Sequence, residues 1–516
     1  MSAIDAARRR VATFARSGPG IVTGIWAVSR VAAYIAGVGF DSRLLPIAQH
    51  LLDVDLLRHD PFTSILYLHS QPPLFNVVTA VFLQLPHSLV TPGLSLAWHA
   101  SGLLTALVTY RVMVRVGIRT WLAVVVVGLF VLSPTAILFE SWFFYSQLQM
   151  LLVALVLLGA ARFAEHRRVA DGLLLTGAFA ALVLLRSLYP VWLMVAFVAL
   201  VWLLLRLDVR KVLAVAAVPL VVALAWNVKN EVIFGRFGSS SWQGMSLWRV
   251  ALAGVPGEEI TALHRQGEID ALSKLPSFGG PSLYRGAVTS DHYGVAATDR
   301  LFKHNGAVNF NAALYLKVSD RFQHDALTAL WHDGIHGIAR AEVAAYALWN
   351  QSGDSYLYRN PDFRALGAYG SWFDRVVLLH YQGSSYSDPL RFALNSPTRL
   401  HHSLLVEILE SVSPTVLALQ LLAVVGGVIG WRRGRAKRDV VMVTVVATTL
   451  LVFVWTMVVS NLAEFGENAR FRTEIWPAII VPAALALEFA IQHRARRRAQ
   501  ASLPTTPRAQ LSQKET

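Results

Sequence analysis

Long apolar segments recur along this chain of 516 residues, and they constrain its fold more than any other feature. A helix that crosses a membrane needs about 20 mostly apolar residues. Hydrophobic residues make up 55% of the chain, which is more than a soluble protein of this length can bury. The sequence therefore predicts an α-helical polytopic membrane protein with about ten spans. We expect these spans at roughly 19–39, 93–113, 119–138, 147–162, 171–187, 190–206, 211–228, 411–431, 439–460 and 474–492.

Two apolar segments are open to more than one interpretation. The first follows Arg8–Arg10 and Arg16, as a secretory signal would, but it is long and lacks a small-residue cleavage site. We therefore expect it to be a retained first span. The second, Pro72 to Leu85, is short for a crossing, and we place it as an interfacial or re-entrant helix on the outer face. Its paired prolines suit the start of a helix.

The basic residues indicate the orientation. The formal charge is +14, but the cations fall in short clusters between apolar segments, which is the positive-inside pattern and not a nucleic-acid surface. If the ten spans alternate, these clusters share one side. We predict that this side is cytoplasmic, that both termini lie there, and that the chain resides in the cell inner (plasma) membrane. The clusters are Arg8–Arg10, Arg111/Arg115/Arg119, Arg162/Arg167/Arg168, Arg206/Arg210/Lys211, Arg432/Arg433/Arg435/Lys437/Arg438 and Arg494/Arg496/Arg497/Arg498.

This topology divides the chain into four parts. Residues 1–229 form an N-terminal transmembrane module that contains a first outer loop at 40–92. Residues 230–410 are more polar, and we expect a mixed, mostly helical extracytoplasmic domain with a membrane-touching helix around Phe373 to Leu379. Residues 411–498 form the C-terminal spans. The polar tail, 499–516, is predicted to be disordered.

Composition and spacing exclude several chemistries. The chain has no cysteine, so disulfides, thiolate catalysis, iron–sulfur clusters and cysteine-ligated zinc are ruled out. His50, His59 and His69 lack the i,i+4 spacing of a zinc site on a helix. No Walker A loop, Gly-x-Ser-x-Gly elbow or HExxH motif occurs.

Two acidic residues lie where spans meet the predicted outer surface. Asp41 follows the first span, and it is either a reactive carboxylate or a solvated helix cap. Glu140 stands among aromatic residues. It is either a carboxylate in an interfacial aromatic belt or a second acid that orients an acceptor and helps Asp41 to hold a divalent cation, Mg²⁺ or Mn²⁺.

Cations on the outer side run against the positive-inside rule. Arg186 and Lys229 lie at outer ends of spans, and Arg470 and Arg472 lie in the last outer loop. Arginine is a natural phosphate ligand because its planar fork donates two parallel hydrogen bonds. The two loop arginines could instead pair with nearby glutamates. Arg30, inside the first span, calls for a buried partner that the sequence does not identify.

Short motifs in the outer loops resemble a known family when taken in order. They are Asp41 after the first span, Ile47-Ala48, His69-x-x-Pro72-Pro73-Leu74, Glu140-Ser141-Trp142-Phe143-Phe144-Tyr145, Arg186-Ser187-Leu188-Tyr189, Lys229-Asn230, Phe237-Gly238-Ser239-Ser240-Ser241-Trp242 and Glu467-Asn468-Ala469-Arg470-Phe471. This pattern resembles the GT-C fold glycosyltransferases, in the bacterial branch similar to protein O-mannosyltransferases and aminoarabinose transferases. It departs from that pattern at Ser42, where relatives often carry a second acid, and at Gln71, which is basic in some of them.

The resemblance implies a GT-C fold and a transferase that moves a sugar of the mannose or arabinofuranose class. The donor would be a polyprenyl-phosphate sugar, and the acceptor a hydroxyl of a glycan, lipid or protein at the extracytoplasmic face. It implies Asp41 as the general base, with Glu140 as the nearest substitute for a second acid. The implied substrate-binding residues are His69, Gln71, Tyr145, Arg186, Tyr189, Lys229, Ser240, Trp242, Glu467, Asn468, Arg470 and Arg472.

Two other functions remain as alternatives. A transporter or flippase of a lipid-linked sugar predicts charged or Gly/Pro-broken residues near the middle of several spans. Only Arg30 is clearly placed in that way, which favours the enzyme. A non-catalytic scaffold would instead use the 230–410 domain to bind partners of the cell envelope.

Overall fold

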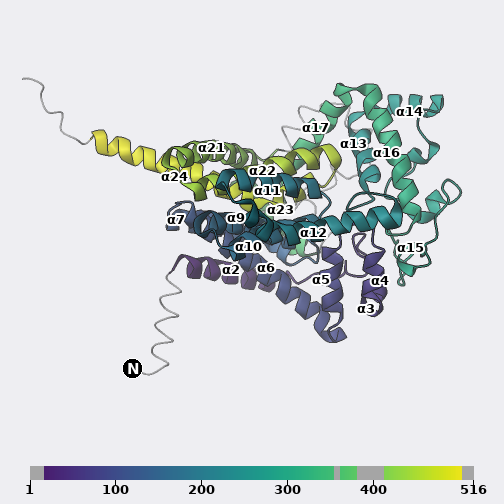
Figure 1. Ribbon diagram of the computed structural model, residues 1–516, viewed down its shortest axis with the longest axis horizontal. Helices are drawn as coiled ribbons and strands as arrows, with labels where there is room; N and C mark the ends of the chain where they lie inside the picture. Colours follow the sequence, from purple (N-terminus) through teal and green to yellow (C-terminus); the bar gives the residue numbers. More distant parts are fainter. Residues whose placement is uncertain (1–16, 354–360, 381–411, 502–516) are drawn as a thin grey trace, which may run out of the picture.

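The computed structural model describes residues 17–353, 361–380 and 412–501. A bundle of helices lies along the long axis of the molecule, and shorter helices cover one end of it (Figure 1). Within the described residues, β structure is limited to three isolated bridges. The bundle contains α2 (Gly18–Ile35), α6 (His87–Arg115), α7 (Thr120–Leu132), α8 (Pro134–Glu140), α9 (Ser146–His166), α10 (Val169–Leu185), α11 (Val191–Leu205), α12 (Val209–Phe234), α21 (Pro414–Lys437), α22 (Val440–Ala463) and α24 (Trp476–Ala501).

The ten segments predicted as spans are mostly helical. Five helices (α9, α12, α21, α22 and α24) are long and apolar enough to cross a membrane, and α7 with α8 would make a sixth. Two further helices, α10 and α11, are apolar but have only 17 and 15 residues. The chain is therefore α-helical with several helices able to span a membrane. Ten crossings remain a prediction.

One predicted span is wrong as a single helix. The segment 119–138 breaks between α7 and α8, which are bent by 64° to each other. Ser133 is extended and caps α8, because its hydroxyl accepts a hydrogen bond from the Ala136 amide at 3.1 Å. Pro134 follows, and a proline disfavours helical backbone at the residue before it. The break frees the Val131 carbonyl, which accepts a hydrogen bond from Arg30 at 2.8 Å.

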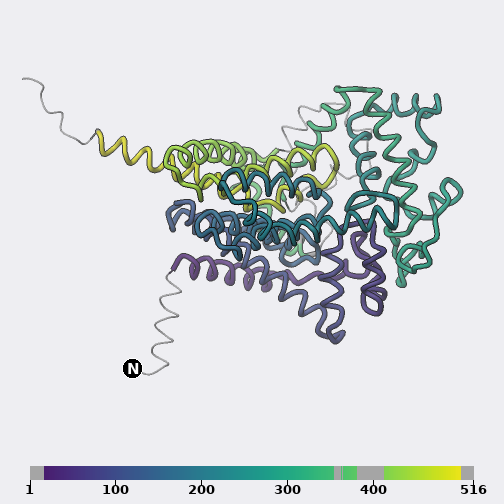
Figure 2. The backbone as a smooth tube through the Cα atoms, in the orientation of Figure 1, coloured from purple at the N-terminus to yellow at the C-terminus, as the bar shows by residue number. Residues whose placement is uncertain are grey.

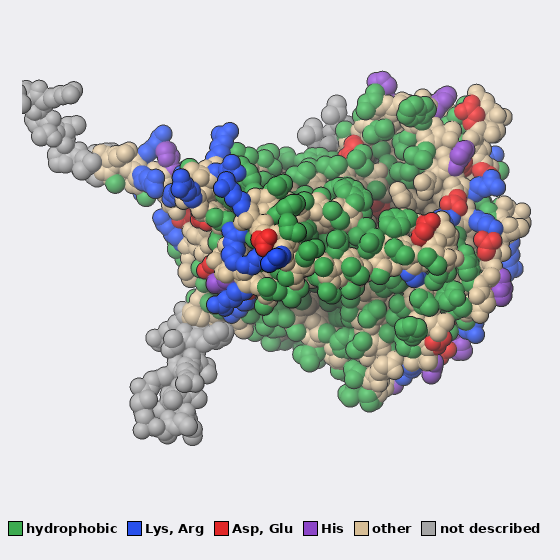
Figure 3. All heavy atoms as spheres, viewed as in Figure 1, with side chains coloured by type: hydrophobic (Ala, Val, Ile, Leu, Met, Phe, Trp, Pro, Cys, Tyr) green, Lys and Arg blue, Asp and Glu red, His purple; other side chains and the backbone are tan. Residues whose placement is uncertain are grey.

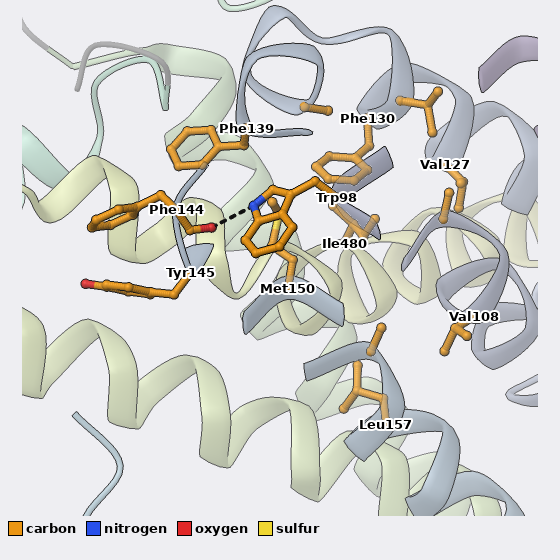
Figure 4. Packing of buried hydrophobic residues seen from close by; sticks show 14 of the residues in the cluster. Trp98, Val108, Val127, Phe130, Phe139, Phe144, Tyr145, Met150, Leu157 and Ile480 are labelled. Carbon is orange, nitrogen blue, oxygen red and sulfur yellow. Dashed lines mark hydrogen bonds between the residues drawn. The ribbon is translucent and has the colours of Figure 1, made fainter. Parts of the chain in front are cut away.

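The centre of the bundle is formed around α9, which contacts α6, α10, α22 and α24. Gly159 permits the close approach of α10, since a Cβ there would lie 2.7 Å from the Leu175 backbone. At the end of α9 nearest the outer layer, the Trp98 indole donates to the Phe144 carbonyl at 2.9 Å. The Tyr145 hydroxyl points away from this apolar packing (Figure 4).

The end of the bundle opposite the covering helices is rich in cations. Lys and Arg side chains gather around this end (Figure 3), and α2 begins and α24 ends there (Figure 2). Ion pairs tie its turns together: Arg119 to Glu488 at 3.0 Å and Arg162 to Asp171 at 2.6 Å. The N-terminal cluster Arg8–Arg10 and the tail beyond residue 501 lie outside the described residues.

The first loop and the polar middle of the chain form one outer layer. Lys303 donates to the Ala48 carbonyl at 2.7 Å, and the Asn311 side chain accepts from the His69 amide at 2.8 Å. The layer contains α3 (Val54–His59), α4 (Pro61–Leu66), α5 (Leu74–Leu83), α13 (Gln243–Gly254), α14 (Gly257–Gln266), η1 (Ala271–Lys274), η2 (Pro281–Tyr284), α15 (Ala296–Asp299), α16 (Leu314–Asp333), α17 (Ile335–Trp349), α18 (Pro361–Ala365) and α19 (Gly367–Val376).

Several sequence predictions correspond to elements of this layer. The short apolar segment from Pro72 is α5, and the expected membrane-touching helix around Phe373 overlaps α19. The segment predicted as the last outer loop contains α23 (Asn468–Glu474), which packs on α9, α17 and α22. Residues 381–410 of the predicted extracytoplasmic domain lie outside the described residues.

Candidate functional site

The segment between α8 and α9 holds the first residue of the candidate site, Asp41, in place. Asp41 pairs with Trp142 in an isolated parallel bridge: its amide donates to the Ser141 carbonyl at 2.7 Å, and its carbonyl accepts from the Phe143 amide at 3.0 Å. Trp142 stacks on Phe144 with their ring centroids 4.4 Å apart. The start of the first loop is thereby fixed to the aromatic segment that leads into α9.

The carboxylate of Asp41 is held ionised by a neighbouring arginine. The Arg43 guanidinium donates to both of its oxygens, at 2.8 and 2.9 Å, and the Arg43 amide adds a third bond at 3.0 Å. Partial burial acts to raise the pKa of Asp41, but the bonds and charge of Arg43 outweigh it, so the pKa lies below its ordinary value. The Asp41 side chain is 8% exposed and that of Arg43 is 64% exposed. The ion pair therefore lies at the surface of the site, with the carboxylate on its inner side.

Two arginines from distant parts of the chain meet beside this segment. Arg186, directly after α10, and Arg470, in α23, both donate to the Tyr145 hydroxyl and to Glu474. Glu474 lies 3.2 Å from Arg186 and 2.8 Å from Arg470, and it also accepts from the Ser146 hydroxyl at 2.6 Å. We call Tyr145, Arg186, Glu467, Arg470 and Glu474 the guanidinium cluster. Glu467 accepts a further hydrogen bond from Arg470.

The guanidinium cluster is buried and its charges balance. Arg186 is 8% exposed and Arg470 is 1% exposed, and both guanidinium groups lie over aromatic rings, with Arg186 4.1 Å from the centroid of Phe471. Burial acts to raise the pKa of Glu467, but Arg470 overrides it and lowers the pKa to about 2. Among the described residues, Arg186 makes hydrogen bonds through only one of its nitrogens, Nη1. Its remaining donors can meet an oxyanion without breaking the cluster.

His50 connects the guanidinium cluster to the outer layer. Its ring lies edge-on to Phe144 and Tyr145, at centroid distances of 5.0 and 5.2 Å, and 5.2 Å from Trp242. Burial and the charge of Arg470 lower its pKa to about 3, so the imidazole is neutral at physiological pH.

A second ion pair borders this histidine region. Glu464, at the end of α22, accepts from Arg249 at 3.0 Å and from Ser246 at 2.8 Å, both in α13. Burial raises the pKa of Glu464. The side chains of Glu464 and Glu467 are each 18% exposed, so both carboxylates remain within reach of solvent.

Lys229, His69 and Ser240 lie elsewhere, where the first loop meets the outer layer. Lys229 donates to the Leu68 carbonyl at 2.6 Å, and Ser240 donates to the Ser70 carbonyl at 2.5 Å. The His69 Nδ1 lies 2.8 Å from the Ser241 hydroxyl. The indole of Trp242, the next residue, donates to the Phe310 carbonyl at 3.3 Å. Lys229 thus bonds to the first loop and not to the guanidinium cluster.

Glu140 occupies a different environment from Asp41. It forms a buried ion pair with Arg30 and accepts from the Trp26 indole at 2.9 Å. This carboxylate is therefore the partner that Arg30 required. Glu140 is only 3% exposed and packs against Gly102, where a Cβ would lie 2.1 Å from its carboxyl carbon.

The other predicted site residues have structural contacts. Tyr189 bonds with Thr456 at 3.0 Å, and Arg472 donates to the Trp349 carbonyl. Asn468 donates to Asn461 at 3.0 Å, and Gln71, just before α5 in the first loop, is half-buried. In the part of the chain that the structure describes, no group of three or more acidic or histidine side chains could hold a metal ion.

Part of the candidate site was not predicted from the sequence. His50 was considered only as a metal ligand, and Glu464, Arg249 and Arg43 were not singled out. The available signal was the density of acids in the last outer loop, where Glu464, Glu467 and Glu474 flank Arg470. No family model, curated protein or solved structure matches this chain.

Proposed function

We propose that this chain is an integral membrane glycosyltransferase with a GT-C fold. It would transfer a sugar of the mannose or arabinofuranose class from a polyprenyl-phosphate donor to an acceptor hydroxyl at the extracytoplasmic face of the inner membrane. The observation that carries the proposal is the guanidinium cluster, with free donors on Arg186, together with the carboxylate of Asp41, which Arg43 keeps ionised; both contact the segment between α8 and α9. Asp41 follows the end of α2 and Glu474 precedes the start of α24, so both lie away from the cation-rich end, where α2 begins and α24 ends.

In the proposed reaction, the acceptor oxygen attacks the anomeric carbon as the bond from that carbon to the carrier phosphate oxygen breaks. The electron pair of this bond leaves with the polyprenyl phosphate. Asp41 accepts the proton of the acceptor hydroxyl. The exposed Arg43 side chain can move into solvent as the acceptor arrives, while the backbone bridge to Trp142 holds Asp41 in place.

The guanidinium cluster supplies the electrostatic part of the proposed mechanism. Negative charge develops on the leaving phosphate, and Arg186 and Arg470 are fixed before the reaction by Tyr145 and Glu474. Groups that are already oriented stabilise this charge without the cost of reorganisation. The prenyl chain would lie along the apolar helices, where each buried CH₂ contributes about 0.8 kcal/mol.

A transporter or flippase of a lipid-linked sugar is the alternative. A transporter is expected to have an ionisable side chain within the bundle that is free to bind the substrate. Arg30 and Glu140 are the ionisable pair of the first span, but they saturate each other together with Trp26 and Val131. This closed arrangement favours the enzyme.

The test uses the purified chain in liposomes, with a polyprenyl-phosphate sugar and a glycan acceptor. A transferase releases free polyprenyl phosphate only when acceptor is present. A flippase moves the intact donor across the bilayer without release. Movement without release would overturn the proposed function.

A further inference from the structure

The last turns of α12 carry a second group of hydrogen-bond donors, separate from the guanidinium cluster. Lys229 donates to the Leu68 carbonyl, and its ammonium nitrogen lies 3.7 Å from the ring centroid of Trp226. His69 packs edge-on against Phe234 of the same helix, at 4.9 Å. Lys229, Trp226 and His69 therefore gather at the last turns of α12, the helix that runs from the bundle to the outer layer (Figure 1). We call these three residues the Lys229 site.

Two of these residues carry buried nitrogens without partners. The Trp226 Nε1 and the His69 Nε2 make no hydrogen bond with any described residue. His69 is only 2% exposed, and its Nδ1 lies 2.8 Å from the Ser241 hydroxyl. A ligand that accepts a hydrogen bond selects the tautomer with the proton on Nε2, in which Nδ1 accepts from the Ser241 hydroxyl. The site then presents an indole N–H and an imidazole N–H, both unused.

The unused groups of the Lys229 site can donate hydrogen bonds to the same ligand. An indole N–H is only a donor, and an ammonium has three hydrogens, of which Leu68 uses one. The described charges that act on His69 are the cations Lys229 and Arg236. A buried donor without an acceptor costs about 1–3 kcal/mol, so a ligand rich in acceptor oxygens and negatively charged is favoured here.

The surroundings indicate where this ligand comes from. Within α12, a helix able to span the membrane, Val228 is 45% exposed and Val232 is 79% exposed. An indole and a lysine at the end of a span lie at the level of lipid headgroups. We propose that Lys229, Trp226 and His69 bind the phosphate of a lipid at the outer membrane surface.

This site is distinct from the one that would meet the leaving phosphate in the proposed transfer. Ser241 bonds to His69, whereas the next residue, Trp242, faces His50 on the side of the guanidinium cluster. The two proposed phosphate sites therefore have different residues and contact neighbouring positions, Ser241 and Trp242. The inference does not depend on catalysis, because a lipid phosphate can bind whether or not a sugar is transferred.

The experiment measures lipid retention on the purified full chain by native mass spectrometry. The probes are phosphatidylglycerol and undecaprenyl monophosphate, each added separately, and inorganic phosphate is the competitor. Two variants remove a hydrogen-bond donor and keep a side chain of similar size. They are Lys229→Gln and Trp226→Phe, of which the second keeps an aromatic ring. Lys211→Gln, at the other end of α12, is the matched control.

We expect each test variant to retain one or both lipids about tenfold less than the unaltered chain, with Lys211→Gln unchanged. Selective loss of undecaprenyl monophosphate identifies a carrier, and loss of phosphatidylglycerol identifies a structural lipid; both support the site. Binding of inorganic phosphate with no lipid preference would contradict a lipid-borne ligand. Equal retention by all variants, or equal loss in the Lys211→Gln control, would overturn the proposal.

Discussion

At the scale of single residues, the candidate site depends on which charges are paired. Arg470 and Arg186 share Glu474, and Asp41 is paired with Arg43 two residues away. The local pairs, Arg470 with Glu474 and Asp41 with Arg43, could be anticipated from the sequence, whereas Arg186 and Glu474 lie 288 positions apart. Glu140 and Arg30 lie 110 positions apart, and only the folded bundle brings them together. Sequence spacing therefore indicated the glutamates that pair with Arg470 but not the distant partners of Arg186 and Arg30.

Replacing Arg43 with Gln should change the pH dependence of transfer. Burial acts to raise the pKa of Asp41, and the Arg43 guanidinium and amide together hold it below its ordinary value; in the variant only the amide bond still opposes burial, so the pKa of Asp41 rises. Asp41 must be ionised to accept a proton, so the loss of activity on acidification should begin at a higher pH in the variant. A pH–rate profile of sugar transfer checks this expectation. An acidic limb at the same pH as in the unaltered chain would count against Asp41 as the base.

We predict a second pH effect, in which the buried imidazole of His69 makes the stability of the protein depend on pH. Burial and the neighbouring Lys229 lower its pKa from 6.5 to about 3. Between these values the unfolded chain binds more protons than the folded chain, so stability falls as the pH drops below about 6.5. His69→Gln removes this titration.

The measurement is the apparent Tm of the detergent-solubilised protein between about pH 4 and 6.5, the window set by this shift. The Tm of the His69→Gln variant should decline less steeply on acidification than that of the unaltered chain. The exposed His59→Gln is the control, and its slope should match the unaltered chain. Parallel slopes for His69→Gln would contradict a neutral buried imidazole.

At the scale of elements, apolar composition and length located the helices but not their breaks or contacts. The segments from 19–39 to 474–492 are mostly helical, whereas the segment 119–138 bends at Ser133 and Pro134. A proline can also lie inside a helix, as Pro92 does in α6, so its presence alone did not predict the break. Capping by the Ser133 side chain distinguishes the two cases.

Helix packing makes a prediction at Gly426. A Cβ at this position in α21 would lie 1.8 Å from the Pro482 carbonyl oxygen of α24. Gly426→Ala should therefore push the two helices apart and destabilise the protein by about 1–3 kcal/mol. Gly177→Ala in α10 meets no atom within 4 Å and should be neutral or slightly stabilising. Thermal unfolding of both variants is the measurement, and an equal Tm for the two would contradict this packing.

At the scale of the whole molecule, the two ends of the bundle differ in charge and in what covers them. One end carries the cations and the other carries the outer layer that holds the first loop (Figure 3). The positive-inside pattern predicted that the cation clusters would share one side. It could not predict how Lys303 and Asn311 bind the first loop, because those contacts join residues about 250 positions apart in sequence.

The natural absence of cysteine makes the topology directly testable. Ser282→Cys lies in the outer layer, and Ala436→Cys lies near the cation-rich end of α21; both positions are exposed. In intact cells, a membrane-impermeant maleimide should label Ser282→Cys only, and both variants should react after the cells are permeabilised. Labelling of Ala436→Cys in intact cells would invert the proposed orientation.

The central claim is that a first-loop carboxylate at the outer face removes the acceptor proton during sugar transfer. Its most direct test is the rate of labelled sugar transfer from a polyprenyl-phosphate donor by Asp41→Asn, with the exposed Asp55→Asn as control. We predict a loss of about 10²- to 10⁴-fold in Asp41→Asn, with normal membrane insertion and Tm, and no loss in Asp55→Asn. Full transfer activity in a folded Asp41→Asn variant would contradict the account.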